Sequence, residues 1–396
     1  MKRKKSLCSL TTVDITMEPF IISQVKYMMV RGWDVTIICN MKPAFIKRIP
    51  KGVKYYHVPM ERSFNLLTAI KCTIQLIKIF KKEKFTIVQY AATHAALYSS
   101  FASWVTQVPI RMHLQWGIYN YSDMGPSGYI YKFVEWLTCK FSTVIRPVSH
   151  MNLQIAINEG LFKAGKGKVL GQGGTVGVDM DEYPLAQKET IRNEIRAKYG
   201  LRPTDYVFGF VGRISIAKGN NELISAFQEI VSNYPNAKLL LVGEDEGSVN
   251  RNLMDWAAAS ECVVITGRVP HKEIPHYMAA MDCLVHPTYR EGFGMVLQEA
   301  MAMAVPIITT NIPGPSEVIE EGKSGILIEP QSKENVLKAM NQVISQPNKY
   351  VEYGKNGRER AVKCFSRLVM LERIYQDKEC LYKEFSEQLL DTEIKK

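Results

Sequence analysis

Short apolar runs alternate along this chain with longer segments in which apolar residues recur at helical spacing. The short runs are predicted to be buried parallel strands, because they are continuously apolar and end at polar residues, glycine or proline. In the first half they span residues 7–10, 35–39, 54–58, 86–90, 111–114, 143–147 and 168–170. In the second half they span residues 206–211, 238–242, 262–266, 283–286, 306–309 and 326–328. The alternation predicts an α/β fold with doubly wound sheets.

The length of the chain indicates two domains. At 396 residues it exceeds the size at which a single hydrophobic core usually stops growing. We place an N-terminal domain at 1–182, a C-terminal domain at 183–364 and a terminal helical segment at 365–396. Helices are expected at 18–31, ended by Gly32, and at 220–233, where apolar residues repeat at helical spacing.

The segment 288–299 combines a turn rich in glycine with two carboxylates. It follows the apolar run that ends at His286, and Gly292 and Gly294 allow a close approach of backbone to ligand. The helix that should begin near Met295 favours an anion at its start. Glu291 and Glu299 can both accept hydrogen bonds from sugar hydroxyls. The pattern indicates a phosphate and sugar pocket; a solvated helix cap is the alternative.

Two cations follow the predicted strand 206–211. Arg213 and Lys218 lie in the loop between that strand and the helix 220–233. Ligands of open α/β sheets bind outside the carboxyl ends of the strands. A guanidinium and an ammonium at that place together suit a diphosphate, whereas either one alone is as easily an ordinary loop cation.

These segments resemble the donor-binding half of a known enzyme family. The segments 210–213, 218–219, 241–244, 266–269 and 291–294, with Glu299, are similar to those of the retaining, nucleotide-sugar-dependent glycosyltransferases of family 4, or group 1. The resemblance spans nearly the whole chain and is more specific in the second half. It implies a GT-B fold of two Rossmann-like domains, with a terminal helix that crosses back to the first domain.

The resemblance also implies an activity and a set of contacts. It indicates a hexosyl- or N-acetylhexosaminyl-transferase that uses a nucleotide sugar, by default a UDP-sugar, and acts on a lipid-linked or glycan acceptor in the biosynthesis of capsule, lipopolysaccharide or another cell-surface polysaccharide. Arg213, Lys218 and Glu291 would be catalytic, and Glu299 would bind the ribose. The full set of implied donor contacts is Gly212, Arg213, Lys218, Gly243, Val269, Glu291, Gly292, Phe293, Gly294, Met295, Val296 and Glu299.

The first domain departs from the family pattern. Relatives commonly place a histidine before a glycine after the strand 111–114, whereas here Trp116 precedes Gly117. Trp116 is expected to give the sugar subsite an apolar wall. His113 is a weaker candidate for that subsite, and a core or surface histidine is the alternative. The turn after the first strand lacks the usual glycine pair, so acceptor recognition is assigned to Thr12, in the predicted turn 11–17, and to residues 119–123.

Charge divides unevenly along the sequence. Residues 1–180 contain 24 Lys and Arg against 9 Asp and Glu, whereas residues 181–396 contain 26 against 30. The basic first half and the mixed apolar and lysine segment 64–84 suggest contact with an anionic membrane surface; a helix that only covers the sheet is the alternative. No nucleic-acid module is recognised, and no nucleic-acid partner is expected.

The remaining features set the expected location and chemistry. No run of eighteen apolar residues is present, and the basic start lacks an apolar signal core, so a cytoplasmic protein, peripheral on the membrane, is expected. Eight scattered cysteines suggest reduced thiols. His271 and His276 are badly spaced for a metal, and no Asp-x-Asp pair occurs. We expect no metal and no cofactor other than the nucleotide-sugar substrate.

Two other functions remain open on the sequence alone. One is a nucleotide-sugar epimerase of GT-B shape, which would convert the donor without an acceptor. The other is a scaffold that binds a nucleotide sugar without turnover, for which Trp116 is the sole hint.

Overall fold

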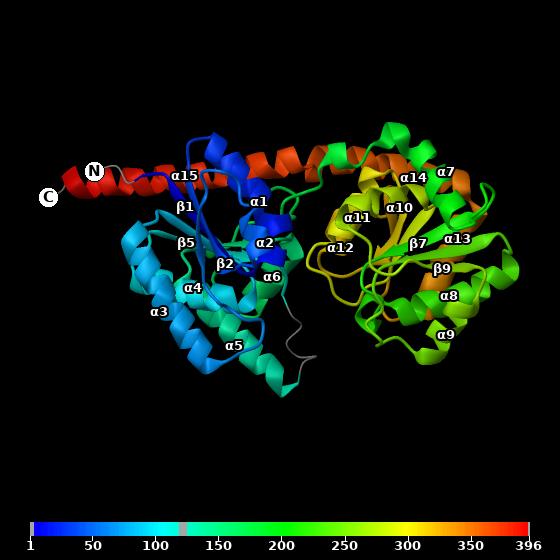
Figure 1. Cartoon of the computed structure of the whole chain (residues 1–396), viewed down its shortest axis with the longest axis horizontal. Helices are drawn as coiled ribbons and strands as arrows, with labels where there is room; N and C mark the ends of the chain where they lie inside the picture. Colours follow the sequence, from blue (N-terminus) through cyan, green and yellow to red (C-terminus); the bar gives the residue numbers. More distant parts are fainter. Residues whose placement is uncertain (1–3, 119–124, 395–396) are drawn as a thin grey trace. The chain divides into compact units, whose positions relative to one another are not determined.

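The computed structural model describes residues 4–118 and 125–394. It forms two compact units, one of residues 1–176 with 370–396 and one of residues 177–369 (Figure 1). We call them unit 1 and unit 2. Residues 119–123, to which the sequence assigned acceptor recognition, lie outside the described residues.

Unit 1 is built on a parallel sheet of six strands in the order β3-β2-β1-β4-β5-β6. The strands are β1 (Ser6–Val13), β2 (Asp34–Asn40), β3 (Lys54–His57), β4 (Ile87–Tyr90), β5 (Ile110–Gln115) and β6 (Val144–Pro147). The helices are α1 (Asp14–Val30), α2 (Pro43–Ile46), α3 (Leu66–Glu83), α4 (Thr93–Val105), α5 (Pro126–Phe141), α6 (His150–Asn158) and most of α15 (Arg367–Ile394).

Each face of the first sheet has its own apolar core, because successive strand residues point to opposite faces. Cys8 and Leu10 of β1 pack with α3 and α4, whereas Leu7 packs on the α1 side, where Tyr375 and Phe385 of α15 join the cluster. The terminal helix is also held by ion pairs within unit 1. Asp377 accepts two hydrogen bonds of 2.8 Å from the guanidinium of Arg146 on β6.

Unit 2 repeats the architecture, with the strand order β12-β11-β10-β7-β8-β9. Its strands are β7 (Tyr206–Val211), β8 (Ala237–Val242), β9 (Val263–Ile265), β10 (Cys283–His286), β11 (Ile307–Thr310) and β12 (Gly325–Ile328). Its helices are α7 (Lys188–Lys198), α8 (Asn220–Asn233), α9 (Arg251–Ala259), α10 (Ile274–Ala280), α11 (Met295–Ala302), α12 (Pro315–Val318), α13 (Lys333–Ser345) and α14 (Pro347–Arg360).

Two sequence predictions about the first unit are wrong. The first strand does not stop at residue 10 but continues to Val13, and α1 begins directly at Asp14, so the predicted turn 11–17 does not exist. Thr11 and Thr12 are polar but buried in the strand. The predicted strand 168–170 is absent; only Gly167 forms an isolated bridge, with Ile145.

Membrane-spanning helices and disulfides are both missing from the described part of the chain. No described helix has the length and apolar composition that a bilayer crossing requires. All eight cysteines are unpaired, and most of them are buried.

Candidate active site

The candidate residues of unit 2 gather where the strand order of the second sheet reverses. The first strand of the unit, β7, pairs in parallel with the fourth, β10. Their following connections run to opposite sides of this pair, and in open α/β sheets ligands bind at such a reversal, outside the carboxyl ends of the strands. Lys218 lies in the loop after β7, and Glu291 lies in the loop after β10. The topology therefore brings together two residues that are 73 positions apart in the sequence.

Backbone contacts fix these two loops against each other. The amide of Tyr289 donates to the carbonyl oxygen of Ala217 at 3.0 Å. Gly219 has a φ of +73°, and a Cβ at this position would stand 2.0 Å from the carbonyl oxygen of Pro287. Only glycine suits both the left-handed conformation and the close approach. The glycine thus allows the Lys218 loop to lie directly on the Glu291 loop.

Lys218 and Glu291 form a half-buried ion pair, and His286 lies beside it in the same network of contacts. Lys218 Nζ lies 2.6 Å from Glu291 Oε2, and the imidazole Nε2 of His286 lies 3.5 Å from the same oxygen. Burial raises the pKa of Glu291, but the adjacent His286 and Lys218 outweigh it and hold this pKa well below its ordinary value. Glu291 is therefore a carboxylate throughout the neutral range, fixed in place by its two partners.

The imidazole of His286 is itself fully buried. It stacks on Phe210 of β7 with ring centroids 5.6 Å apart and an interplanar angle of 17°. Burial lowers the pKa of His286, and the nearby Lys218 acts in the same direction, against Glu291. His286 is therefore neutral at pH 7 and acts as a rigid neighbour of the Glu291 carboxylate.

Arg213 occupies a different position from Lys218 in the loop after β7. Its side chain is 66% exposed and forms an ion pair with Glu246, which follows β8. The structure therefore brings Arg213 to the carboxyl edge of the sheet but does not join it to the Lys218 and Glu291 network. Gly243 allows the loop after β8 to lie directly against the loop after β7, since a Cβ at this position would stand 1.7 Å from the carbonyl oxygen of Gly212.

Glu299 lies in α11 and is 6% exposed. Its carboxylate is 3.1 Å from His271 Nε2, and this hydrogen bond raises the pKa of His271. The buried Tyr183 lies near the same carboxylate; burial raises the pKa of its hydroxyl, and the negative charge of Glu299 adds to this. Glu299 is thus an anchored carboxylate, with partners that the sequence did not indicate.

The other predicted donor contacts surround the start of α11 and the end of β9. Gly294 has a φ of +90° and directly precedes the first residue of α11, Met295. The positive end of this helix therefore faces the loop that carries Glu291. Val269 follows β9, and the amide of Gly243 donates to the carbonyl oxygen of Gly267 at 3.1 Å, which holds that segment beside the end of β8.

The candidates of unit 1 do not form one cluster. Thr12 is 4% exposed within β1. Trp116 follows the end of β5 and packs on Phe20 of α1, at a centroid distance of 5.1 Å. His113 lies inside β5, is 4% exposed, and bonds Glu135 of α5 through Nε2 at 2.9 Å. This placement favours the alternative of a core histidine.

Glu135 also connects His113 to a possible set of metal donors. Gln115 Nε2 donates to Glu135 Oε1 at 2.6 Å, and Cys139 Sγ is 3.9 Å from it. Atoms of His113, Glu135 and Cys139 lie within 4.8 Å of one another. Burial raises the pKa of the Cys139 thiol far above its ordinary value, so the thiol is protonated and donates to Glu135 instead of offering a thiolate to a metal.

Three residues that support the candidate carboxylates were not predicted from the sequence. They are His286 beside Glu291, and His271 and Tyr183 beside Glu299. For His286 a signal was present, because a histidine at the end of an apolar strand and five residues before Glu291 reaches the same edge of the sheet. The other two are brought in by tertiary packing and carry no local signal.

A substitution of His286 tests whether it positions Glu291. In the variant His286→Phe, which keeps an aromatic ring on Phe210, turnover is expected to fall about tenfold, because Glu291 loses one of the two side chains that hold its carboxylate and about 1.4 kcal/mol of positioning corresponds to that factor. His286→Gln, which keeps a polar atom near the carboxylate, should recover part of the loss. Steady-state rates and thermal unfolding of both variants check this. Equal rates in the wild type and both variants would show that His286 does not position Glu291.

Two family models match the chain. The model of glycosyl transferases group 1 matches residues 191–360, and that of glycosyl transferase 4-like proteins matches residues 7–147. The capsular polysaccharide biosynthesis glycosyltransferase CapM of Staphylococcus aureus is 29% identical over 97% of this chain and 98% of its own length. The UDP-Gal:alpha-D-GlcNAc-diphosphoundecaprenol alpha-1,3-galactosyltransferase of Escherichia coli is 24% identical over 86% of this chain and 88% of its own length.

A solved structure shows the same architecture. Anabaena Alr3699/HepE in complex with UDP and glucose superposes with a TM-score of 0.76 at 18% identity, and the match covers 95% of this chain and 100% of that chain. At this identity the likeness concerns the fold. With the two parallel six-stranded sheets, it confirms the two-domain α/β fold of GT-B type that the sequence predicted.

Proposed function

We propose that this chain, which belongs to the group 1 glycosyltransferases, transfers a sugar from a UDP-sugar to a lipid-linked acceptor in cell-surface polysaccharide biosynthesis, with retention of the anomeric configuration. The observation that carries the proposal is the network of Lys218, Glu291 and His286 at the switch point of the second sheet. A fixed cation and a fixed carboxylate outside the carboxyl ends of β7 and β10 suit a diphosphate and a sugar, respectively.

The choice of donor and acceptor is supported by relatives of known chemistry. HepE is described in complex with UDP and glucose, and the E. coli relative is named for a UDP-Gal donor and a diphosphoundecaprenol acceptor. CapM is named for capsular polysaccharide biosynthesis. We propose that this chain likewise uses a UDP-sugar as donor and a lipid-diphosphate-linked sugar as acceptor. The acceptor is assigned to unit 1, and the enzyme to the cytoplasmic face of the membrane.

The mechanism follows from the charges that the site supplies. The bond between the anomeric carbon and the β-phosphate oxygen breaks, and its electron pair stays on that oxygen. Lys218, with Arg213 and the positive end of α11, stabilises the developing negative charge. The acceptor hydroxyl bonds to the same face of the anomeric carbon and passes its proton to the departing phosphate oxygen. Glu291 holds the sugar hydroxyls, and Glu299 holds the ribose.

An assay of isolated donors separates transfer from the two alternatives. The chain is incubated with UDP-, GDP- and ADP-sugars without an acceptor, and the products are resolved by chromatography. Slow release of UDP from one UDP-sugar is the expected result, since water replaces the acceptor. Interconversion of two nucleotide sugars would support an epimerase instead. Tight binding without any release, also after a lipid-linked acceptor is added, would support a scaffold.

Metal removal tests the assigned role of the cations. We expect the chain to keep its full turnover after treatment with EDTA, because Lys218 and Arg213 are proposed to supply the positive charge that a divalent ion would otherwise bring to the departing diphosphate. The rates before and after chelation are compared directly. A complete loss of turnover that magnesium or manganese restores would contradict the proposal.

A further inference from the structure

One layer of unit 1 exposes an unusual number of large apolar side chains. Of the 23 large apolar side chains that are exposed among the described residues, 13 lie between residues 64 and 136. They belong to α3, α4, α5 and the segments that enter these helices, which lie side by side over one face of the first sheet (Figure 1). The members are Phe64, Leu66, Leu67, Ile70, Ile74, Phe101, Trp104, Val105, Tyr129, Ile130, Tyr131, Phe133 and Trp136.

In α3 this exposed face is separate from the face that forms the core. Cys72, Leu76 and Phe80 are buried against the sheet. Leu67, with 69% of its surface exposed, and Ile70, with 49%, project from the opposite side of the helix. Residues four or seven positions apart share a face of a helix. The outer apolar side chains therefore contribute nothing to the core and are available to a partner.

The charge on the same layer is almost entirely positive. The helices α3, α4 and α5 contain six lysines and two glutamates. Both glutamates are engaged within unit 1. Glu83 is bonded by Lys54 at 3.0 Å and by Tyr56 at 2.6 Å, and Glu135 is bonded by His113. The outer surface thus combines exposed lysines with tryptophan, tyrosine and aliphatic side chains.

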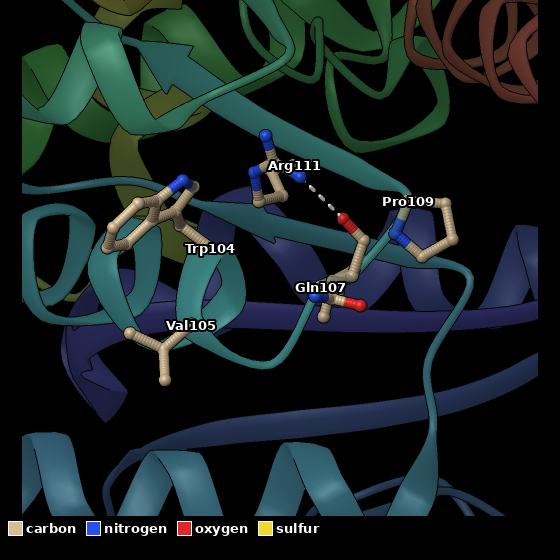
Figure 2. A pocket seen from close by; sticks show the side chains of 6 residues that line it. Trp104, Val105, Gln107, Pro109 and Arg111 are labelled. Atoms are coloured by element: carbon tan, nitrogen blue, oxygen red, sulfur yellow. Dashed lines mark hydrogen bonds between the residues drawn. The ribbon is translucent and has the colours of Figure 1, made fainter.

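An open pocket of about 530 Å³ lies at one end of this layer, beside Trp104 and Arg111 (Figure 2). The guanidinium of Arg111 donates to the carbonyl oxygens of Phe141, at 2.6 Å, and Val108, at 2.8 Å. Burial lowers the pKa of Arg111, which means that its charge is partly stripped of water. An anion in the pocket would stabilise this cation. Phe101, Trp104 and Phe141 form an aromatic cluster beside it.

We propose that the outer face of α3, α4 and α5 docks on an anionic phospholipid surface, with the pocket beside Arg111 receiving a lipid phosphate. On such a membrane the lysines would contact the anionic headgroups, and the apolar and aromatic side chains would enter the boundary of the acyl chains. A protein partner would not require a surface whose charges are nearly all positive. Only the benefit of docking for access to the acceptor rests on the proposed function. The helices α3 and α5 begin at the carboxyl edge of the first sheet, so docking would present that edge to an acceptor held in the membrane.

Vesicle sedimentation with the full chain tests the surface. We expect binding to phosphatidylcholine vesicles that contain about one third phosphatidylglycerol, at least about tenfold above binding to phosphatidylcholine alone. The double variant Lys78→Glu/Lys81→Glu should bind at least about thirtyfold more weakly, because each lost lysine removes about 1 kcal/mol and each new carboxylate is repelled by the anionic surface. Leu67→Asn/Ile70→Asn should bind about tenfold more weakly. Lys26→Glu and Val30→Asn, exposed positions on α1, are the matched controls and should bind like the wild type.

Three outcomes would overturn the proposal. The wild type stays in the supernatant with both kinds of vesicle; or the α1 controls lose as much binding as the α3 variants; or the chain forms a dimer that Leu67→Asn/Ile70→Asn dissociates, which would assign the face to a second copy. Donor hydrolysis without vesicles is measured on the same proteins. The α3 variants should hydrolyse the donor at the wild-type rate, and a wild type that binds vesicles but hydrolyses no donor would overturn the proposed function alone.

Discussion

The turnover number of the variant Lys218→Ala is expected to be at least about a hundredfold lower than that of the wild type. The ammonium group lies outside the carboxyl ends of β7 and β10, where the departing diphosphate is proposed to bind. Removal of one preformed donor to a developing oxyanion typically costs about a hundredfold to a thousandfold in turnover. The effect should be on kcat, because the negative charge develops as the bond breaks. Steady-state kinetics with a nucleotide sugar and a validated acceptor measure it.

A second effect of this variant has to be separated from catalysis. Lys218 and Glu291 form a half-buried ion pair of 2.6 Å, and loss of one partner leaves the other charge uncompensated. The double variant Lys218→Ala/Glu291→Gln removes that charge, so it should regain thermal stability while turnover stays low. Lys323→Ala, an exposed lysine of the same unit, is the control. Wild-type turnover in Lys218→Ala would rule out the assigned role.

The variant Glu299→Ala is expected to raise the donor KM by roughly tenfold to a hundredfold. Hydrogen bonds to a charged group contribute about 1.5–3 kcal/mol each, and Glu299 is assigned to the ribose, which does not change during the reaction. A contact that is equal in the ground state and the transition state alters KM and leaves kcat nearly constant. A rise in KM at nearly constant kcat would therefore distinguish Glu299 from Lys218, whose loss should lower kcat.

The affinity for free UDP should change in parallel with the KM of Glu299→Ala. Calorimetric titration of UDP measures this affinity without an acceptor. Glu299→Gln keeps one acceptor oxygen and should lie between the wild type and the alanine variant. An unchanged affinity for UDP in Glu299→Ala would show that Glu299 of α11 does not bind the ribose.

Local sequence patterns predicted the second unit well. The strands Tyr206–Val211 and Cys283–His286 and the helix Asn220–Asn233 have the predicted boundaries, because a buried parallel strand is an uninterrupted apolar run and a helix has a distinct period. Thr11 and Thr12 misled the prediction for the first unit. They read as a turn, but their branched side chains are buried in β1, and burial in a sheet overrides local polarity.

The sequence placed the candidate side chains at the correct loops but did not give their partners. Lys218 and Glu291 follow two strands that the order of the sheet makes neighbours, and this could be anticipated from the parallel architecture. The ion pair of Arg213 with Glu246, and the contacts of Glu299 with His271 and Tyr183, could not. They depend on how loops of different length fold over the edge of the sheet, which no local period encodes.

A crystal structure of the chain with UDP would show whether one site in unit 2 binds the nucleotide diphosphate. We expect a diphosphate within hydrogen-bond distance of Lys218 Nζ and beside the first residues of α11, with the ribose hydroxyls on the carboxylate of Glu299. If UDP instead binds at another place, with Lys218 and Glu299 both without contact to it, the proposed donor site is wrong.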